Sequence, residues 1–247
     1  MDIAALSETR LAGESELCER GSRYTFFWSS RGSEERREAG VSFAVKTALI
    51  GKLAGPPKEV NDRLMTMKLP LLSGRKHIII SCYAPTMINP DEMKAKFYGD
   101  LHSVIADVPL ADRLVILGDF YARVGCDHVA WDGVLGKYGV GHYNSNGLLL
   151  LQTCTEHKLL ITNSHLPPYP SWMHPRTIVR KRDRQDVRVT KSMCCADCWT
   201  DHRLNITKLN IRIQPKRCPQ GKKAPKRLNI TKLKCTRTKQ LLVDALV

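Results

Sequence analysis

The sequence predicts an α/β or α+β body that ends near residue 213 and is followed by a basic tail. Short apolar or alternating runs typical of strands recur along the chain, and segments with helical apolar spacing lie between them. Beyond Gln214 the composition becomes rich in Lys, Arg, Pro and Gly, which is typical of disordered chain. A chain of 247 residues is long enough for one large domain.

The first third of the chain supplies strands. The candidates are short apolar or alternating runs: Ile3–Leu6, Tyr24–Trp28, Gly40–Val45, Leu64–Leu69 and Ile78–Tyr83. The last of these is β-branched and predicts a buried strand, which Ala84 and Pro85 end.

The middle of the chain supplies two helices. A cap at Asn89, followed by Pro90 and two acids, opens a predicted helix whose apolar positions run from Met93 to Ile105. A turn or cap at 144–147 precedes a second helix over Leu148–His157. The remaining strand candidates are Arg113–Gly118, which closes at Asp119, then Leu159–Thr162, Val187–Thr190 and one or two strands within Arg203–Ile213.

The positive charge is concentrated at the C-terminal end. Asn205–Val247 holds twelve Lys or Arg and one acid, Asp244, so twelve minus one gives +11 of the net +15. Residues 1–213 are therefore expected to form the domain, and residues 214–247 a basic, disordered tail or linker. Such a tail attracts nucleic acid or an anionic surface. DNA or another nucleic acid is therefore an expected partner of the tail. No run approaches the ~18 apolar residues of a membrane span, and no membrane is expected as a partner.

The cysteines and the N-terminus indicate a reducing compartment. The nine Cys are an odd number without the spacing of a disulfide framework. The segment from Met1 to Glu8 lacks the basic start and apolar core of a signal peptide. Lys222–Arg227 resembles a nuclear-import signal. We therefore expect a nuclear or cytoplasmic protein that is not secreted.

Three acidic residues and one imidazole suit phosphoester chemistry. Asp201 and His202 are adjacent, so the carboxylate can orient the ring while the ring meets a phosphate or an attacking water. Asp119 ends a buried strand, and Glu8 lies near the N-terminus. Together these oxygen donors could complete a site for a divalent metal.

Six motifs occur in the order found in the exonuclease-endonuclease-phosphatase superfamily. They are Ser7-Glu8-Thr9, Ser81-Cys82-Tyr83-Ala84-Pro85, Gly118-Asp119-Phe120, Asn144-Ser145-Asn146-Gly147, Ser171-Trp172 and Thr200-Asp201-His202. The sequence between these motifs resembles that of the APE-like endonuclease domain of LINE-type (RTE/BovB-like) retrotransposons, and the resemblance covers nearly the whole chain. The resemblance implies a DNase-I-like four-layer sandwich of two mixed β-sheets flanked by helices.

The resemblance also implies magnesium-dependent, or manganese-dependent, hydrolysis of a DNA phosphodiester, with no small-molecule cofactor. By matching positions, Glu8 would hold the metal, Tyr83 would contact the phosphate and Asp119 would orient or deprotonate the water. His202, with Asp201 near it, would stabilise the transition state. The substrate-binding positions would be Asn146 and Trp172.

Three departures from the family predict impaired activity. The family has the motif Gly-Asp-Phe-Asn, and this chain has Tyr121 at the position of the Asn. A carboxamide is therefore replaced by a larger phenol. An N-terminal strand that the family carries ahead of Met1 is absent, so the domain is expected to be incomplete. The Asp of a family strand between Trp172 and Asp201, which pairs with the catalytic His, has no counterpart. The loss of a single donor of this kind costs about 10²–10³ in rate, and losses within one catalytic unit do not simply add.

Several alternatives follow from these departures. The chain could be a non-catalytic protein that binds nucleic acid through its basic surface and tail, or a non-functional retroelement remnant without a stable fold. The charged run Arg176–Lys191 is either a solvated loop or the lining of a DNA groove. Cys195 and Cys198 have zinc-ligand spacing, and His202 could be a third ligand.

Overall fold

The computed structural model describes residues 1–19, 21, 23–30, 39–165, 175–192 and 205–215. The chain divides into two units, Met1–Gln214 and Pro215–Val247. The second unit lies outside the described residues apart from Pro215, and so does nearly all of the predicted tail. The fold described below is that of the first unit.

The larger sheet has six strands and is mixed. Its neighbours are, in order, β11 (Leu159–Ile161), β12 (Pro175–Arg180), β8 (Arg113–Asp119), β7 (Lys76–Tyr83), β6 (Leu64–Pro70) and β5 (Lys58–Asn61). β7 and β8 run parallel, and every other pair is antiparallel. A parallel pair needs a crossover, which the segment between Tyr83 and Arg113 supplies.

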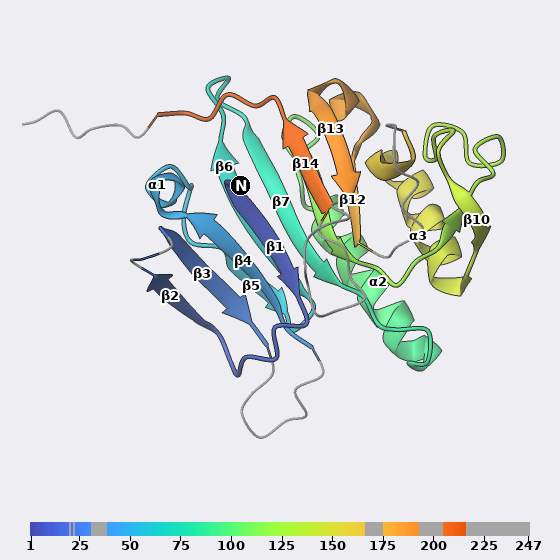
Figure 1. Ribbon diagram of the computed structural model, residues 1–247, viewed down its shortest axis with the longest axis horizontal. Helices are drawn as coiled ribbons and strands as arrows, with labels where there is room; N and C mark the ends of the chain where they lie inside the picture. Colours follow the sequence, from blue (N-terminus) through green and yellow to red (C-terminus); the bar gives the residue numbers. More distant parts are fainter. Residues whose placement is uncertain (20, 22, 31–38, 166–174, 193–204, 216–247) are drawn as a thin grey trace, which may run out of the picture. The chain divides into compact units, whose positions relative to one another are not determined.

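The second sheet has four strands, in the order β1 (Ile3–Ser7), β4 (Val41–Lys46), β3 (Tyr24–Ser29) and β2 (Ser15–Glu19). It is antiparallel throughout, so only one of the two sheets is mixed. Figure 1 shows this sheet beside the larger one. Two-stranded pairings join β9 (Val124–Gly125) to β10 (Val140–Tyr143) and β13 (Val187–Ser192) to β14 (Asn205–Leu209).

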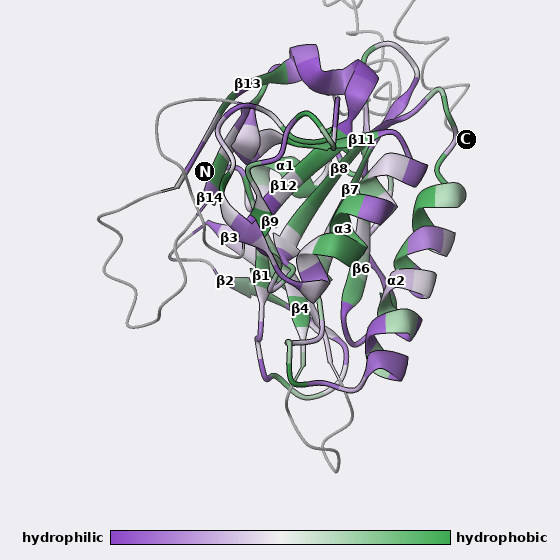
Figure 2. Ribbon diagram, turned by 90° about the vertical axis from the view of Figure 1, so that its right-hand side faces the viewer, coloured by the Kyte–Doolittle hydropathy of each residue, from purple (hydrophilic) through white to green (hydrophobic). Residues whose placement is uncertain are grey.

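Two buried cores define the layers. One contains side chains of β7, β8, α2 (Asp91–Ala106) and α3 (Ser145–Glu156), so both longer helices cover one face of the six-stranded sheet (Figure 2). The other lies between the two sheets and includes Phe27 and Phe43 of one sheet and Met65 and Met67 of the other. The short helical segments are α1 (Thr47–Ile50), η1 (Thr162–Ser164) and η2 (Lys181–Asp186).

Most predicted elements are present, with two corrections. The α2 helix forms where expected, but Asn89 does not cap it: its side chain accepts hydrogen bonds from the backbone and hydroxyl of Thr86. The charged run from Arg176 is not a solvated loop. Its first part is the core strand β12, in which Arg176 and Arg180 are buried.

Candidate active site

Three strands end at the same place, and each carries a predicted site residue at its end. Glu8 follows β1, Tyr83 ends β7 and Asp119 ends β8. The Ser7 hydroxyl donates to the Cys82 carbonyl over 3.4 Å, which holds the end of β1 against β7. Tyr83 and Asp119 are register partners in the parallel pair. The fold therefore gathers residues that are far apart in the sequence.

A glycine permits the close approach of β7 and β8 at this point. A Cβ on Gly118 would lie 2.1 Å from the Cys82 carbonyl oxygen, well inside contact distance. This requirement explains the glycine immediately before Asp119. The carboxylate that follows is fixed in turn, because Asp119 Oδ1 accepts the backbone N–H of Tyr121 at 3.0 Å.

Glu8 is held by a neighbouring arginine. The Arg10 guanidinium donates to the Glu8 carboxylate and forms an ion pair with it, although both side chains are partly exposed. Both Glu8 and Asp119 raise the pKa of the Tyr83 and Tyr121 phenols, behind the larger effect of burial. Both carboxylates therefore act on the same pair of phenols, in agreement with the hydrogen bond that holds Ser7 against β7.

The two tyrosines fill this region. Their hydroxyl oxygens lie 3.2 Å apart in a hydrogen bond, and their rings pack edge to face with centroids 5.9 Å apart. Burial is the main cause that raises the pKa of both phenols, so both are protonated at neutral pH. The Arg63 guanidinium lies over the Tyr83 ring at 5.4 Å and donates to the Tyr83 carbonyl.

The backbone at Tyr121 favours a different residue. Its φ is +46°, in the left-handed region that Asn tolerates and bulky residues rarely adopt. The resembling family has Asn at this position, so the backbone conformation matches the family residue better than the residue present. The larger side chain is accommodated through its contact with Tyr83.

Asn146 is a buried scaffold residue in this structure. Its side chain is 1% exposed, and its amide donates to the carbonyls of Pro85 at 2.8 Å and Phe120 at 3.4 Å. These contacts tie α3 to the segments that follow β7 and β8. The predicted phosphate contact of Asn146 stays a prediction, and it would require one of these donors to be released.

The predicted cap of the second helix is confirmed. The Asn144 carboxamide accepts the N–H groups of Gly147 and Arg123 and donates to the carbonyl of Tyr121. One side chain therefore fixes both the start of α3 and the loop that carries Tyr121. A Cβ on Gly147 would lie 1.6 Å from the Arg123 carbonyl, so this helical position has to be glycine.

An arginine stands close to Asp119 on the neighbouring strand. In the β12–β8 pair, Pro175 is the partner of Asp119 and Arg176 is the partner of Gly118. Burial lowers the pKa of Arg176 to about 10, against the opposing effect of Asp119. Its guanidinium donates to the Ala122 carbonyl at 3.0 Å. Neither β12 nor β13 contains the Asp that the family pairs with its catalytic His.

Three predicted site residues, Trp172, Asp201 and His202, lie outside the described residues. The zinc alternative at Cys195 and Cys198 lies there too. Conversely, Arg10 and Arg63 were not predicted, because an isolated arginine without a partner at helical or strand spacing carries no site signal.

The residues present fit a hard cation by donor type. Glu8 and Asp119 offer carboxylate oxygens, and the buried Asn146 Oδ1 has no hydrogen-bond partner among the described residues. Oxygen donors of this kind suit Mg²⁺ or Mn²⁺. The Arg10 cation beside Glu8 competes with such an ion for the same carboxylate.

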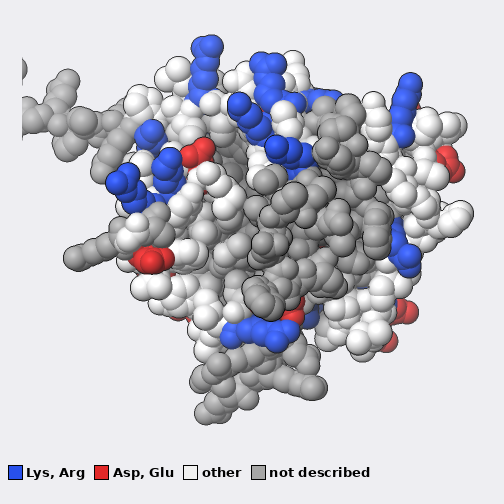
Figure 3. Space-filling model, viewed as in Figure 1, with Lys and Arg blue, Asp and Glu red and all other residues white. Residues whose placement is uncertain are grey.

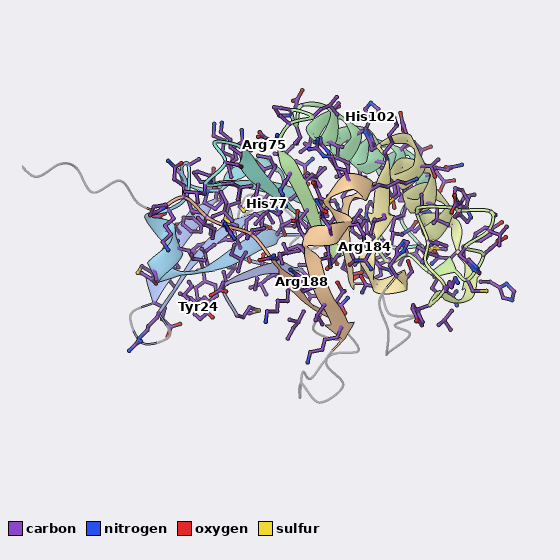
Figure 4. All side chains as sticks on the ribbon, turned by 90° about the horizontal axis from the view of Figure 1, so that it is seen from above. Tyr24, Arg75, His77, His102, Arg184 and Arg188 are labelled. Carbon is purple, nitrogen blue, oxygen red and sulfur yellow. The ribbon has the colours of Figure 1, made fainter. Side chains whose placement is uncertain are left out.

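Basic side chains are also exposed on the β13–β14 pair and just beyond it. Arg188 and Lys191 on β13, Lys208 on β14 and Arg212 beyond it are exposed, and Lys and Arg outnumber Asp and Glu on the face in Figure 3. Figure 4 shows Arg184 and Arg188 on η2 and β13. Among the described residues, no helix has both the length and the apolar composition to cross a bilayer.

The sequence matches no profile of a known protein family. It is 30% identical over 230 residues to craniofacial development protein 2 of Bos taurus, covering 87% of this chain and 37% of that protein. The same protein of Tragulus javanicus is also 30% identical, with 38% of it covered. The chain thus spans little more than a third of these curated relatives.

Solved structures with the same fold are nucleases of low sequence identity. The AP endonuclease LMAP of Leishmania major superposes with a TM-score of 0.60 at 12% identity, over 87% of this chain and 79% of that one. The endonuclease domain of TRAS1, a telomere-specific non-LTR retrotransposon, gives 0.53 at 15% identity, over 77% and 80%. The 3′ phosphatase NExo from Neisseria, bound to a product DNA hairpin, gives 0.51 at 13% identity, over 85% and 89%.

Proposed function

The chain has the DNase-I-like fold of the exonuclease-endonuclease-phosphatase superfamily, and on this premise we propose that it is a retrotransposon-derived DNA endonuclease domain with a degraded active site. Its hydrolysis of DNA phosphodiesters in the presence of Mg²⁺ or Mn²⁺ is expected to be weak or absent. Its expected compartment is the nucleus or the cytoplasm.

The observation that carries this proposal is the contact between Tyr83 and Tyr121. The two phenols bond to each other at 3.2 Å, and the Asp119 carboxylate accepts the backbone N–H of the same Tyr121 at 3.0 Å. In the family, Tyr83 would contact the phosphate, and a carboxamide at position 121 would bind the phosphate or the water. In this chain the Tyr121 phenol instead forms a hydrogen bond with the Tyr83 hydroxyl, the group that would contact the phosphate.

The remaining residues retain parts of the chemistry. A bound divalent cation would neutralise charge that grows on the phosphate oxygens, with Glu8 as the residue that holds it. Asp119 would orient or deprotonate the attacking water. The Arg176 cation close to Asp119 attracts its carboxylate and would help to hold it in place for that role. His202, with Asp201, would supply the transition-state contact.

A plasmid-nicking assay with Mg²⁺ tests the proposal. The purified chain is expected to nick far more slowly than an intact endonuclease of this fold, and any nicking should disappear in Glu8→Ala and in His202→Ala. Robust nicking by the unaltered chain would contradict the degraded-site proposal. Nicking that survives both substitutions would mean that the activity belongs to another site or to a contaminant.

A second function is nucleic-acid binding without catalysis. The net charge of +15 and the exposed arginines and lysines on β13 and β14 support it. Because contacts with DNA phosphates require no intact catalytic site, the chain can bind nucleic acid even if it no longer hydrolyses it. The third possibility, a remnant without a stable fold, predicts no cooperative thermal transition, whereas the two buried cores predict one.

A further inference from the structure

A cluster of two histidines and one glutamate lies outside the candidate active site. His102 is on α2, Glu156 is the last residue of α3, and His157 follows it as the C-cap. Figure 4 shows His102 at the surface of the molecule. One ligand atom from each side chain lies within 4.8 Å of the other two.

We propose that His102, Glu156 and His157 form a zinc site that links α2 to α3. Two separations between donor atoms support this. His157 Nε2 lies 3.0 Å from His102 Nδ1, and His102 Nδ1 lies 3.4 Å from Glu156 Oε1. Ligand bonds of about 2.0–2.1 Å in a tetrahedron place neighbouring donor atoms roughly 3.3–3.4 Å apart. The side chains therefore need only small adjustments to share one ion.

The donor types select zinc over the cation proposed for the active site. Imidazole nitrogen suits zinc and its transition-metal neighbours, whereas Mg²⁺ takes oxygen ligands. The 3.0 Å contact between two ring nitrogens requires one of them to accept, so at least one ring is neutral and offers its lone pair. Two imidazoles and one carboxylate are a set that binds zinc in proteins and leaves a fourth position for water.

The helix geometry also favours a cation here. Glu156 and His157 stand at the C-terminal end of the twelve-residue α3, where the aligned peptide dipoles concentrate negative charge. The last turn of α3 contains no basic residue that would neutralise it. The side chains of His102 and Glu156 are 48% and 62% exposed, so an ion can enter from solvent.

Zinc binding to the full chain, measured by calorimetry and by the shift in melting temperature, tests the proposal. Nine cysteines could bind zinc elsewhere, so the comparison is between variants. His102→Ala should lose one zinc equivalent, or weaken that equivalent at least about 100-fold, because even outer-shell partners are worth about 10–100-fold. Glu156→Gln should weaken it as well. The matched control His142→Ala removes an exposed histidine of β10 and should bind as the unaltered chain does.

The melting temperature separates a metal site from a hydrogen-bonded histidine pair. Without metal, His102→Ala should melt close to the unaltered chain, because the side chain is half exposed. With zinc, only chains that retain His102 should gain stability from this site. The same zinc stoichiometry and the same zinc-induced shift in His102→Ala and His142→Ala would overturn the proposal. X-ray absorption can also identify the ligands of the zinc ion that the unaltered chain binds and His102→Ala does not. Sulfur ligands to that ion would overturn the proposal.

Discussion

At the scale of single residues, three of the five non-glycine residues with left-handed backbone in the described part of the chain lie at the candidate site. Glu8, Arg10 and Tyr121 all have positive φ, and none of them is a glycine or an asparagine. Such conformations cost on the order of 1–3 kcal/mol each and persist where the surrounding structure enforces them. At Tyr121, the Asn144 carboxamide and Asp119 provide that enforcement through three hydrogen bonds to the loop. The loop conformation thus suits an Asn, the residue of the resembling family, better than it suits Tyr121.

His77 predicts a pH dependence of stability. It is 3% exposed, neither ring nitrogen has a hydrogen-bond partner among the described residues, and burial lowers its pKa to about 4. In the unfolded chain the pKa is about 6.5. Between these values the unfolded state binds more protons, so the free energy of unfolding falls as pH falls from about 6.5 to 4. The full loss is about 3 kcal/mol.

Urea unfolding at pH 7, 6 and 5 measures this loss. His77→Leu should remove much of the dependence, while the exposed His142→Ala should keep it. An unchanged pH slope in His77→Leu would mean that other groups cause the acid sensitivity.

At the scale of elements, two helical glycines predict opposite effects of the same change. Helix propensity alone favours Ala over Gly by about 1 kcal/mol at both positions. A Cβ on Gly99 in α2 would meet no neighbouring atom within 4 Å, whereas a Cβ on Gly147 in α3 would meet the Arg123 carbonyl at 1.6 Å. Gly99→Ala should raise the melting temperature, and Gly147→Ala should lower it and loosen the Tyr121 loop. Stabilisation by both substitutions would show that α3 does not approach this loop.

The buried arginine at the end of β12 supports a further prediction. Arg180 donates to the carbonyls of Val108 at 2.8 Å, Pro109 at 2.9 Å and Asp112 at 3.0 Å. Arg180→Met would remove these three bonds, although the Pro109 carbonyl keeps the Asp112 N–H and the Asp112 carbonyl keeps Arg182 as donors. The loss should cost about 2 kcal/mol in unfolding free energy. Arg188→Met, at an exposed position of β13, should cost less than about 0.5 kcal/mol. Equal effects in urea unfolding would argue that β12 is a solvated loop after all.

The strands that the sequence did not reveal have physical reasons for being hidden. β2 is exposed at all five positions, so it shows no apolar alternation and is held by its backbone pairing to β3. β12 could not be recognised as a core strand because its arginines are typical of a protein surface. In the structure they are buried and donate hydrogen bonds to backbone carbonyls. By contrast, β7 and β8 were predictable because burial on both faces produces an unbroken β-branched run. The end of the strand located Asp119, and the resemblance to the family assigned roles to Glu8 and Tyr83. No sequence pattern predicts a contact such as Tyr83–Tyr121.

At the scale of the whole molecule, the basic tail predicts a salt-dependent contribution to DNA binding. Of the twelve Lys and Arg after residue 204, Lys208 and Arg212 precede Pro215, so deleting Pro215–Val247 removes ten. Because each neutralised phosphate adds about 0.9 to the slope of log K against log salt, the truncated chain should bind more weakly and with a shallower slope. Its melting temperature should change little, since both cores lie within Met1–Gln214. An unchanged salt slope would place the DNA contacts on the folded unit.

The most direct measurement of the degraded-site proposal is the rate of Mg²⁺-dependent plasmid nicking after Tyr121→Asn. This change removes the phenol from Tyr83, supplies a carboxamide and suits the left-handed backbone. We expect nicking that exceeds that of the unaltered chain by at least about tenfold and that disappears when Glu8→Ala is added. The gain is expected to stay below the about 10²–10³-fold that one such donor is worth, because the other departures from the family remain. Tyr143→Asn, at an exposed tyrosine of β10, should change nothing. A Tyr121→Asn chain that folds and binds DNA but nicks no faster than the unaltered chain would contradict the claim that this phenol blocks the site.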